Sequence, residues 1–210
     1  MSAPTPAAER PQLYLITPPA FDPAPFADQL AAVLDGAEIA CIRLALATRD
    51  EDAVARAADA LRDVAHARDV ALVIESHVLM VERLGLDGVH LTDGARNLRK
   101  VRKDLGEDAI VGAYCGITRH DGINAAEAGA DYVAFGPVGR TPLGAGETAP
   151  DDLFQWWSEM IEVPVVAEGA LSVEDVARLA PMTDFFAFGE EIWRSEDPLL
   201  ALRALVAPLG

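Results

Sequence analysis

The sequence predicts a single α/β domain built as a closed (βα)8 TIM barrel. Apolar, strand-like stretches alternate with amphipathic helical stretches at near-regular spacing along the 210 residues, as expected for a parallel sheet with helical crossovers. The strand-like stretches end in small or turn-forming residues and lead into variable loops. An open, doubly wound sheet would alternate in the same way, but eight repeats within this length favour a closed barrel.

The predicted strands are short runs rich in Val, Ile, Leu and aromatic residues, as buried parallel strands require. They cover residues 12–17, 39–46, 71–75, 88–92, 109–114, 132–136, 164–169 and 185–189. The predicted helices cover 25–34, 51–67, a short stretch ending at 84, 96–105, 118–128, 150–161, a stretch capped by a box at 172–175, and a terminal stretch opening at 197–198. The barrel therefore spans residues 12–210, and the Pro- and Ala-rich residues 1–11 form a disordered N-terminal tail.

Charge and cysteine content limit the partners and the compartment. The chain has 17 basic against 34 acidic residues, a formal charge of −17 at pH 7. Such a surface repels a polyanion, which excludes nucleic acid as a partner. Cys41 and Cys115 fall in or beside predicted strands, and buried thiols of this kind indicate a reducing compartment. Because no leader and no bilayer-length apolar run is present, we expect a cytoplasmic protein without membrane contact.

Active sites of (βα)8 barrels lie at the carboxyl ends of the strands. Arg43 at such an end is either an anion contact or the partner of Glu75 in a structural ion pair. Glu168 is either a general base or metal ligand facing the mouth, or the partner of a structural cation. His90 lies within a strand, which is typical of a core histidine with satisfied polar atoms.

Five motifs carry a family resemblance. They are YLIT at 14–17, GLDGVHL at 85–91, VG at 111–112 with RH at 119–120, GADYVAFG at 129–136 and VVAEG at 165–169. In order and spacing they resemble thiamine phosphate synthase over residues 12–192. The resemblance implies a barrel that uses Mg²⁺ to join hydroxymethylpyrimidine diphosphate to thiazole phosphate. Diphosphate leaves a benzylic-type carbon, which the thiazole nitrogen attacks, and Mg²⁺ and cations stabilise the leaving group.

Several motif positions depart from the family pattern. Gln-Leu-Arg-x-Lys is Cys-Ile-Arg-Leu-Ala at 41–45, and an Asn-Asp pair is Glu-Ser at 75–76. Gly-Gln-x-Asp is Thr-Asp-Gly-Ala at 92–95, a strand-five serine is Tyr114, and Thr-x-Thr-Lys is Thr-Pro-Leu-Gly at 141–144. The arginine is kept while the lysine and the Asn-Asp pair are missing. These changes imply a remodelled diphosphate site.

The strand-end positions and the resemblance together give the candidate residues their roles. The catalytic candidates are Arg43, Glu168 and His120, the last because the sister thiazole tautomerases use a histidine from this region. The phosphate- or substrate-binding candidates are Thr141, Gly136, Gly169, Gly189 and Tyr114, and the Mg²⁺ candidates are Asp93 and Glu75. Asp93 is alternatively a helix cap, and the glycines are alternatively needed only for tight turns.

Three functions follow as hypotheses. The first is a thiamine-phosphate-synthase-type transferase with a remodelled site. The second is a non-catalytic, phosphate-ligand-binding or regulatory barrel. The third is a tautomerase-like enzyme using Glu168 or His120. The implied partner is a small phosphorylated molecule of the thiazole phosphate or thiamine phosphate class, and the resemblance allows a homo-oligomer.

Overall fold

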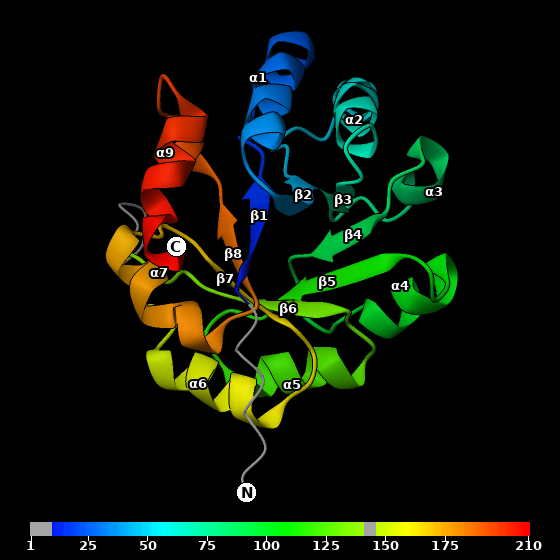
Figure 1. Cartoon of the computed structure of the whole chain (residues 1–210). Helices are drawn as coiled ribbons and strands as arrows, with labels where there is room; N and C mark the ends of the chain where they lie inside the picture. Colours follow the sequence, from blue (N-terminus) through cyan, green and yellow to red (C-terminus); the bar gives the residue numbers. More distant parts are fainter. Residues whose placement is uncertain (1–9, 141–145) are drawn as a thin grey trace, which may run out of the picture.

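The computed structural model describes residues 10–140 and 146–210. Eight parallel strands close into a barrel in the sequential order β1 to β8, and β8 pairs with β1. Figure 1 shows the strands at the centre and the helices around them. The predicted closed (βα)8 barrel is therefore confirmed.

The observed elements follow the predicted order. The strands are β1 Gln12–Ile16, β2 Ile39–Leu44, β3 Ala71–Glu75, β4 Gly88–Leu91, β5 Ile110–Tyr114, β6 Tyr132–Phe135, β7 Val165–Glu168 and β8 Phe185–Phe188. The helices are α1 Pro23–Gly36, α2 Glu51–His66, α3 Met80–Leu84, α4 Leu98–Leu105, α5 Arg119–Glu127, α6 Asp151–Met160, α7 Val173–Leu179, α8 Glu190–Trp193 and α9 Pro198–Leu205. The capping box predicted at α7 is present between Ser172 and Asp175.

The structure adds elements that the sequence pattern did not predict. Helix α8 and the 3₁₀ turns Ala180–Met182 and Ala207–Leu209 are too short to show a hydrophobic period. Six strands end one or two residues earlier than predicted, because the threonines, glycines and other residues at those positions already belong to the turns that leave the sheet. The predicted disordered tail falls mostly on residues 1–9, which lie outside the described residues, and it stays a prediction.

The core has two layers because successive strand residues face opposite sides of the sheet. On β1, Leu13 and Leu15 face the helices, whereas Tyr14 faces the barrel axis. The interior layer consists of Tyr14, Cys41, Val73, Tyr132, Ala134, Val166 and Ala187. A Cβ at Gly112 would lie 2.0 Å from the Tyr132 ring, so glycine at this position leaves room for that ring inside the barrel.

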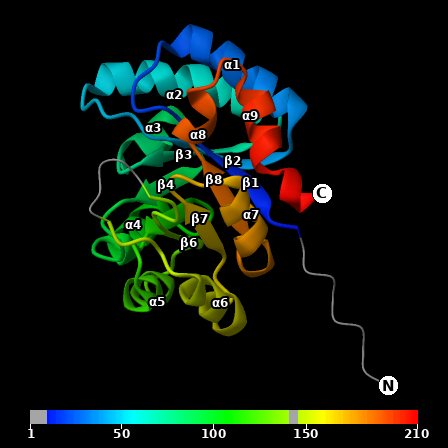
Figure 2. The ribbon, with the colours of Figure 1, turned by 90° about the vertical axis from the view of Figure 1, so that its left-hand side faces the viewer.

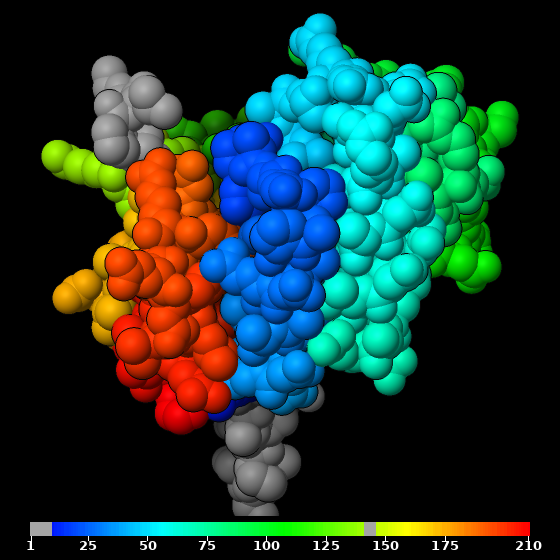
Figure 3. All heavy atoms as spheres, turned by 90° about the horizontal axis from the view of Figure 1, so that it is seen from above, coloured from blue at the N-terminus to red at the C-terminus, as the bar shows by residue number. Residues whose placement is uncertain are grey.

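The ring of helices closes where the first and last strands, β1 and β8, lie side by side. Figure 2 shows α1 and α2 running side by side, and Figure 3 shows α1 between α9 and α2 on this face. The buried ring of Phe26 on α1 packs edge-on against Trp193 of α8, with centroids 4.9 Å apart. Across residues 10–140 and 146–210, no helix is long and apolar enough to cross a membrane.

Candidate active site

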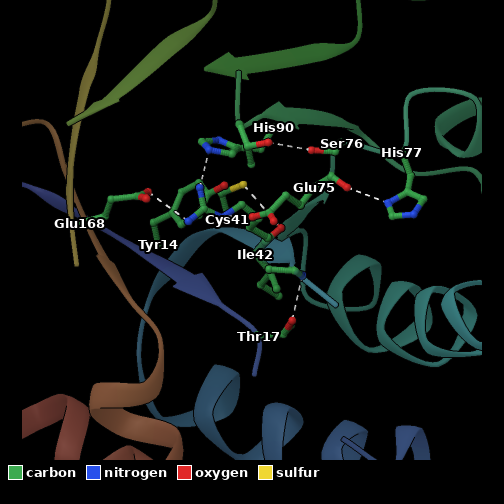
Figure 4. Close-up of polar contacts among 12 residues, drawn as sticks. Tyr14, Thr17, Cys41, Ile42, Glu75, Ser76, His77, His90 and Glu168 are labelled. Atoms are coloured by element: carbon green, nitrogen blue, oxygen red, sulfur yellow. Dashed lines mark hydrogen bonds and ion pairs between the residues drawn. The ribbon is translucent and has the colours of Figure 1, made fainter. Parts of the chain in front are cut away.

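A hollow of about 320 Å³ opens at the carboxyl ends of the strands. Its walls come from β2, β3, β4, β5 and β7 and from the loops after β4, β6 and β7: Arg43, Glu75, His90, Thr92, Tyr114, Pro137, Glu168 and Gly169. We call this the mouth hollow, and we call Arg43, Glu75, His90 and Glu168 the mouth cluster. In Figure 4, the side chains of His90 and Glu168 come from different strands, and each ends at a dashed contact that joins it to Arg43.

Arg43 is the centre of the mouth cluster and is only 5% exposed. Its Nη2 atom lies 3.1 Å from Glu168 Oε2, and its Nε atom lies 3.7 Å from Glu75 Oε2. Its Nη1 atom donates a hydrogen bond to His90 Nε2 over 2.5 Å. Of the two roles left open for Arg43, the structure therefore shows the ion pair, and it includes Glu168 as well as Glu75.

The bond to Arg43 fixes the protonation of His90. Guanidinium nitrogens only donate, so His90 Nε2 accepts and the ring proton resides on Nδ1. Nδ1–H then donates to Tyr132 Oη over 2.9 Å, and the hydroxyl groups of Tyr132 and Tyr14 share a hydrogen bond over 2.8 Å. A chain of hydrogen bonds thus links Arg43 to Tyr14 inside the barrel.

The environment sets the charges of these groups. Burial, followed by the charge of Arg43, lowers the pKa of His90 well below 6.5, so the imidazole is neutral at pH 7. Burial raises the pKa of Glu75, and Glu168 raises it further, while Arg43 opposes both effects. Burial and Glu168 likewise raise the pKa of Tyr114. With both carboxylates ionised, the mouth cluster carries one positive and two negative charges.

Three predicted binding residues, Tyr114, Gly136 and Gly169, shape the mouth hollow. Tyr114 Oη donates to the carbonyl of Gly136 over 2.5 Å. A Cβ at Gly136 would lie 2.4 Å from the carbonyl oxygen of Glu168, so glycine lets the ends of β6 and β7 approach closely. Gly169 has a φ of +92° and its carbonyl accepts hydrogen bonds from the loop after β6, at Val138 and Gly139. These contacts hold Glu168 at the mouth.

The backbone N–H of Gly189, a predicted phosphate contact, already has an acceptor. Glu191 Oε2 accepts from Gly189 N over 2.7 Å, and Glu191 Oε1 accepts from Leu171 N over 3.1 Å. We call these three residues the β7–β8 corner. Its carboxylate takes the hydrogen bonds that a bound anion would take there, whereas the adjacent Glu190 points outward and pairs with Arg194.

The predicted metal residues do not share a site. Asp93 is exposed, accepts a hydrogen bond from Asn97 and lines a second hollow of about 500 Å³ beside the first. Glu75 lines only the mouth hollow, where it pairs with Arg43. Among the described residues, no three His, Cys, Asp or Glu side chains form a cluster that could hold a metal ion. The described residues therefore provide no all-protein Mg²⁺ cage.

The remaining candidates lie outside the mouth cluster. His120 is exposed on α5, where its Nε2 accepts from Asn124, and it does not line the mouth hollow. Thr141 lies outside the described residues. Cys41 and Cys115 are buried and free, and burial raises both pKa values to about 12, so neither is an activated nucleophile.

The prediction that His90 is a core histidine with satisfied polar atoms is confirmed. Sequence reasoning missed the partners of His90 and the roles of Tyr132 and Glu191. The period of two along β2, β3 and β4 could have found His90, because it places Arg43, Glu75 and His90 on the same inner face. The roles of Tyr132 and Glu191 depend on contacts across the barrel and between loops. No local pattern signals those contacts.

Comparisons with known proteins agree with this architecture. The family model described as thiamine monophosphate synthase matches residues 13–188. A thiamine-phosphate synthase from Rhodospirillum centenum is 44% identical over 186 residues, covering 87% of this chain and 89% of the relative. One from Erythrobacter litoralis is 32% identical over 192 residues, covering 89% of this chain and 90% of the relative.

A solved structure supports the fold independently. The thiamine phosphate pyrophosphorylase from Pyrococcus furiosus superposes with a TM-score of 0.81 at 20% identity, covering 94% of this chain and 95% of that one. At this identity the likeness shows the fold alone. The sequence matches go further, since they span nearly the whole barrel at up to 44% identity. The chain belongs to the thiamine monophosphate synthase family.

Proposed function

We propose that this chain is a transferase of thiamine biosynthesis that joins hydroxymethylpyrimidine diphosphate to thiazole phosphate, forming thiamine phosphate in a remodelled mouth. The observation that carries the proposal is the near-complete match to a thiamine-phosphate synthase at 44% identity. The geometry supports a two-substrate reaction, because the mouth hollow and the second hollow adjoin and share Thr92 and Tyr114. Two small molecules would lie side by side there.

In this reaction the bond between the pyrimidine methylene carbon and the diphosphate oxygen breaks, and its electron pair leaves with diphosphate. The lone pair of the thiazole nitrogen then forms the new C–N bond, which leaves the thiazolium ring positively charged. The chain contributes a buried, preorganised polar mouth between these groups. Because the described residues form no all-protein Mg²⁺ cage, we route no step through the ion.

The test is direct synthesis. Purified protein is incubated with both precursors and Mg²⁺ or Mn²⁺, and thiamine phosphate is measured by mass spectrometry, with each precursor omitted in turn. We expect product only when both precursors are present. Glu190→Gln, an exposed substitution outside both hollows, is the matched control and should retain full turnover. No product with either metal would refute the transferase.

A second function is favoured by two specific observations. Arg43 is neutralised by carboxylates, and the N–H groups of the β7–β8 corner are already bonded to Glu191. Both features suit a non-catalytic barrel that binds a ligand of the thiazole phosphate or thiamine phosphate class. Calorimetric titration with each compound tests this reading. Binding without turnover would favour it over the transferase, and absence of heat with both compounds would exclude it.

A further inference from the structure

We infer that the amino end of the barrel, opposite the mouth, holds a second binding site for a small molecule that carries one apolar ring and one carboxylate. The site is separate from the mouth hollow, because no described residue lines both. The strands have four to six residues and rise about 3.3 Å per residue, which separates the two ends by on the order of 15 Å. The inference therefore goes beyond the proposed function and does not depend on it.

The first observation is an apolar hollow on the barrel axis, which we call the amino-end hollow. Its volume is about 310 Å³, and the amino-terminal parts of every strand except β4 line it. Tyr14, Tyr132 and Phe185 supply aromatic walls, whereas the inward-facing Cys41 and Ala71 are small. Interiors of such barrels are normally filled by bulky branched side chains. Two small residues on adjacent strands therefore leave this end of the axis open.

The amino-end hollow presents no free charge. Asp131 is the only acid among its described lining residues. The Oδ2 atom of Asp131 accepts a hydrogen bond from Val111 N over 2.7 Å and pairs with Arg102. The size of the hollow is at the small end for ligand sites. A single ring fits such a space, and its burial there is favourable because apolar surface leaves water.

The second observation is a charged hollow of about 630 Å³ that adjoins the first and shares Gln12 and Ala40 with it. We call it the arginine hollow. The charged residues described in its lining are Arg10, Glu38 and Arg203, which together carry one net positive charge. The whole chain carries a formal charge of −17. A local excess of positive charge on such a chain favours an anionic group at this place.

The fold places one of these arginines through a close helix contact. A Cβ at Gly36 would lie 2.3 Å from the Leu199 side chain, so glycine lets α9 approach the end of α1. Arg203 lies one turn after Leu199, and its Nη2 atom donates to the carbonyl of Gly36 over 3.0 Å. This bond holds the guanidinium at the arginine hollow. Its remaining N–H groups have no partner among the described residues and can donate to an anion.

The two hollows together define the ligand. The aromatic walls of the amino-end hollow take a ring, and the adjoining arginine hollow takes an anionic group attached to it. One net positive charge matches a singly charged carboxylate better than a doubly charged phosphate. A neutral ring would leave the arginines unused, and an anion without a ring would leave the apolar hollow empty. The ligand class is therefore an aryl or arylalkyl carboxylate.

The test uses 3-phenylpropionate as the probe and measures its binding to the full chain by ligand-observed NMR titration. Two matched compounds divide the contributions: 3-phenylpropanamide keeps the shape without the charge, and propionate keeps the charge without the ring. We expect 3-phenylpropionate to bind with a Kd of about 1 mM or tighter. The amide should bind at least about threefold more weakly, and propionate should show no binding at millimolar concentrations. Salt at 1 M should weaken the acid and leave the amide unchanged.

Variants locate the probe. Ala71→Leu fills the amino-end hollow and should weaken 3-phenylpropionate binding about tenfold or more. Arg203→Gln should bring the affinity for the acid down to that for the amide. Arg99→Gln, an exposed arginine of α4 that lines neither hollow, is the matched control and should bind like the wild type. Circular dichroism confirms that each variant is folded.

Four outcomes would overturn the inference. They are equal binding of the acid and the amide, unchanged binding in both Ala71→Leu and Arg203→Gln, absence of binding, and binding that falls as the protein concentration rises. The last outcome would assign this face to contact with a second copy of the chain. A truncated chain that lacks residues 1–9 provides a further check. Tenfold tighter binding after truncation would identify that segment as the occupant in place of a small molecule.

Discussion

The mouth cluster and the β7–β8 corner each contain a glutamate, and the two glutamates have different roles. In the mouth, Glu168 lies 3.1 Å from a buried arginine and lacks a full set of hydrogen bonds. In the corner, Glu191 accepts two backbone hydrogen bonds, from Gly189 and Leu171, and joins the loops after β7 and β8. The carboxylate of Glu168 remains available to a ligand at the mouth hollow, whereas the carboxylate of Glu191 is occupied by backbone hydrogen bonds.

The difference shows how a partner determines what an acidic residue can do. A carboxylate with its hydrogen bonds satisfied by backbone N–H groups contributes mainly to stability. A carboxylate that pairs with an arginine next to an open hollow still has lone pairs for a ligand. The expected consequence is that changes in the corner reduce stability more than binding, whereas changes at Glu168 reduce both, because they leave the buried Arg43 without its nearest carboxylate.

We expect the largest loss of stability from removing Arg43, the cation of the mouth cluster. Arg43→Met leaves Glu168 mostly buried without a positive partner. Removing one partner of a buried ion pair typically costs about 3–5 kcal/mol, because the remaining charge is uncompensated. Urea unfolding followed by circular dichroism should show a loss of this size in the free energy of unfolding.

The double variant Arg43→Met/Glu168→Leu provides the control. Replacing both charges with apolar groups removes the unpaired carboxylate, so most of the lost stability should return. If the single variant lost less than about 1 kcal/mol, the pair would behave like an exposed one. The contrast between the mouth and the corner would then disappear.

The next largest effect is expected in the corner. Glu191→Ala removes the acceptor for the N–H groups of Gly189 and Leu171 and should lower the free energy of unfolding by about 1–3 kcal/mol. Binding of thiamine phosphate should stay near the wild-type level. Glu191→Gln keeps one acceptor oxygen and should lose less stability. A large loss of thiamine phosphate affinity in Glu191→Ala at unchanged stability would contradict this assignment.

The sequence was sufficient for the fold because its signals are local. Each strand and most helices show their own period and turn residues, and the period of two places Arg43, Glu75 and Glu168 at strand ends on the inner face. The identity of the arginine's partners depends on barrel closure, which brings β7 across from β2. Whether position 190 or 191 points inward depends on the single turn of α8, and that turn has no sequence period.

A smaller, pH-dependent effect is expected from His90. Its pKa is lowered in the fold, whereas in the unfolded chain it is about 6.5. Below that pH the unfolded chain binds a proton that the folded chain does not, so the His90 contribution to stability is full above pH 6.5 and declines as the pH falls. Compared with His90→Asn, the wild type should lose up to about 1.4 kcal/mol per pH unit between pH 6.5 and 5.5.

Parallel unfolding curves across this range make the comparison. Other titrating groups are shared by the two proteins and cancel in the difference. A constant difference from pH 7.5 to 5.5 would show that His90 is not held neutral by Arg43. The assignment of His90 as acceptor from Arg43 and donor to Tyr132 would then be wrong.

The smallest effect is expected at Glu190, which is adjacent in sequence to the corner carboxylate but points outward. Its side chain is 51% exposed and pairs with Arg194, whose side chain is 74% exposed. Exposed pairs four residues apart contribute about 0.3–0.5 kcal/mol and are screened by salt. Glu190→Gln should therefore reduce stability by no more than this amount, and 1 M NaCl should remove the difference. A stability loss as large as that of Glu191→Ala would mean that Glu190 and Glu191 both support the β7–β8 corner. The contrast between a carboxylate that can bind a ligand and one that only stabilises the fold would then depend on Glu168 alone.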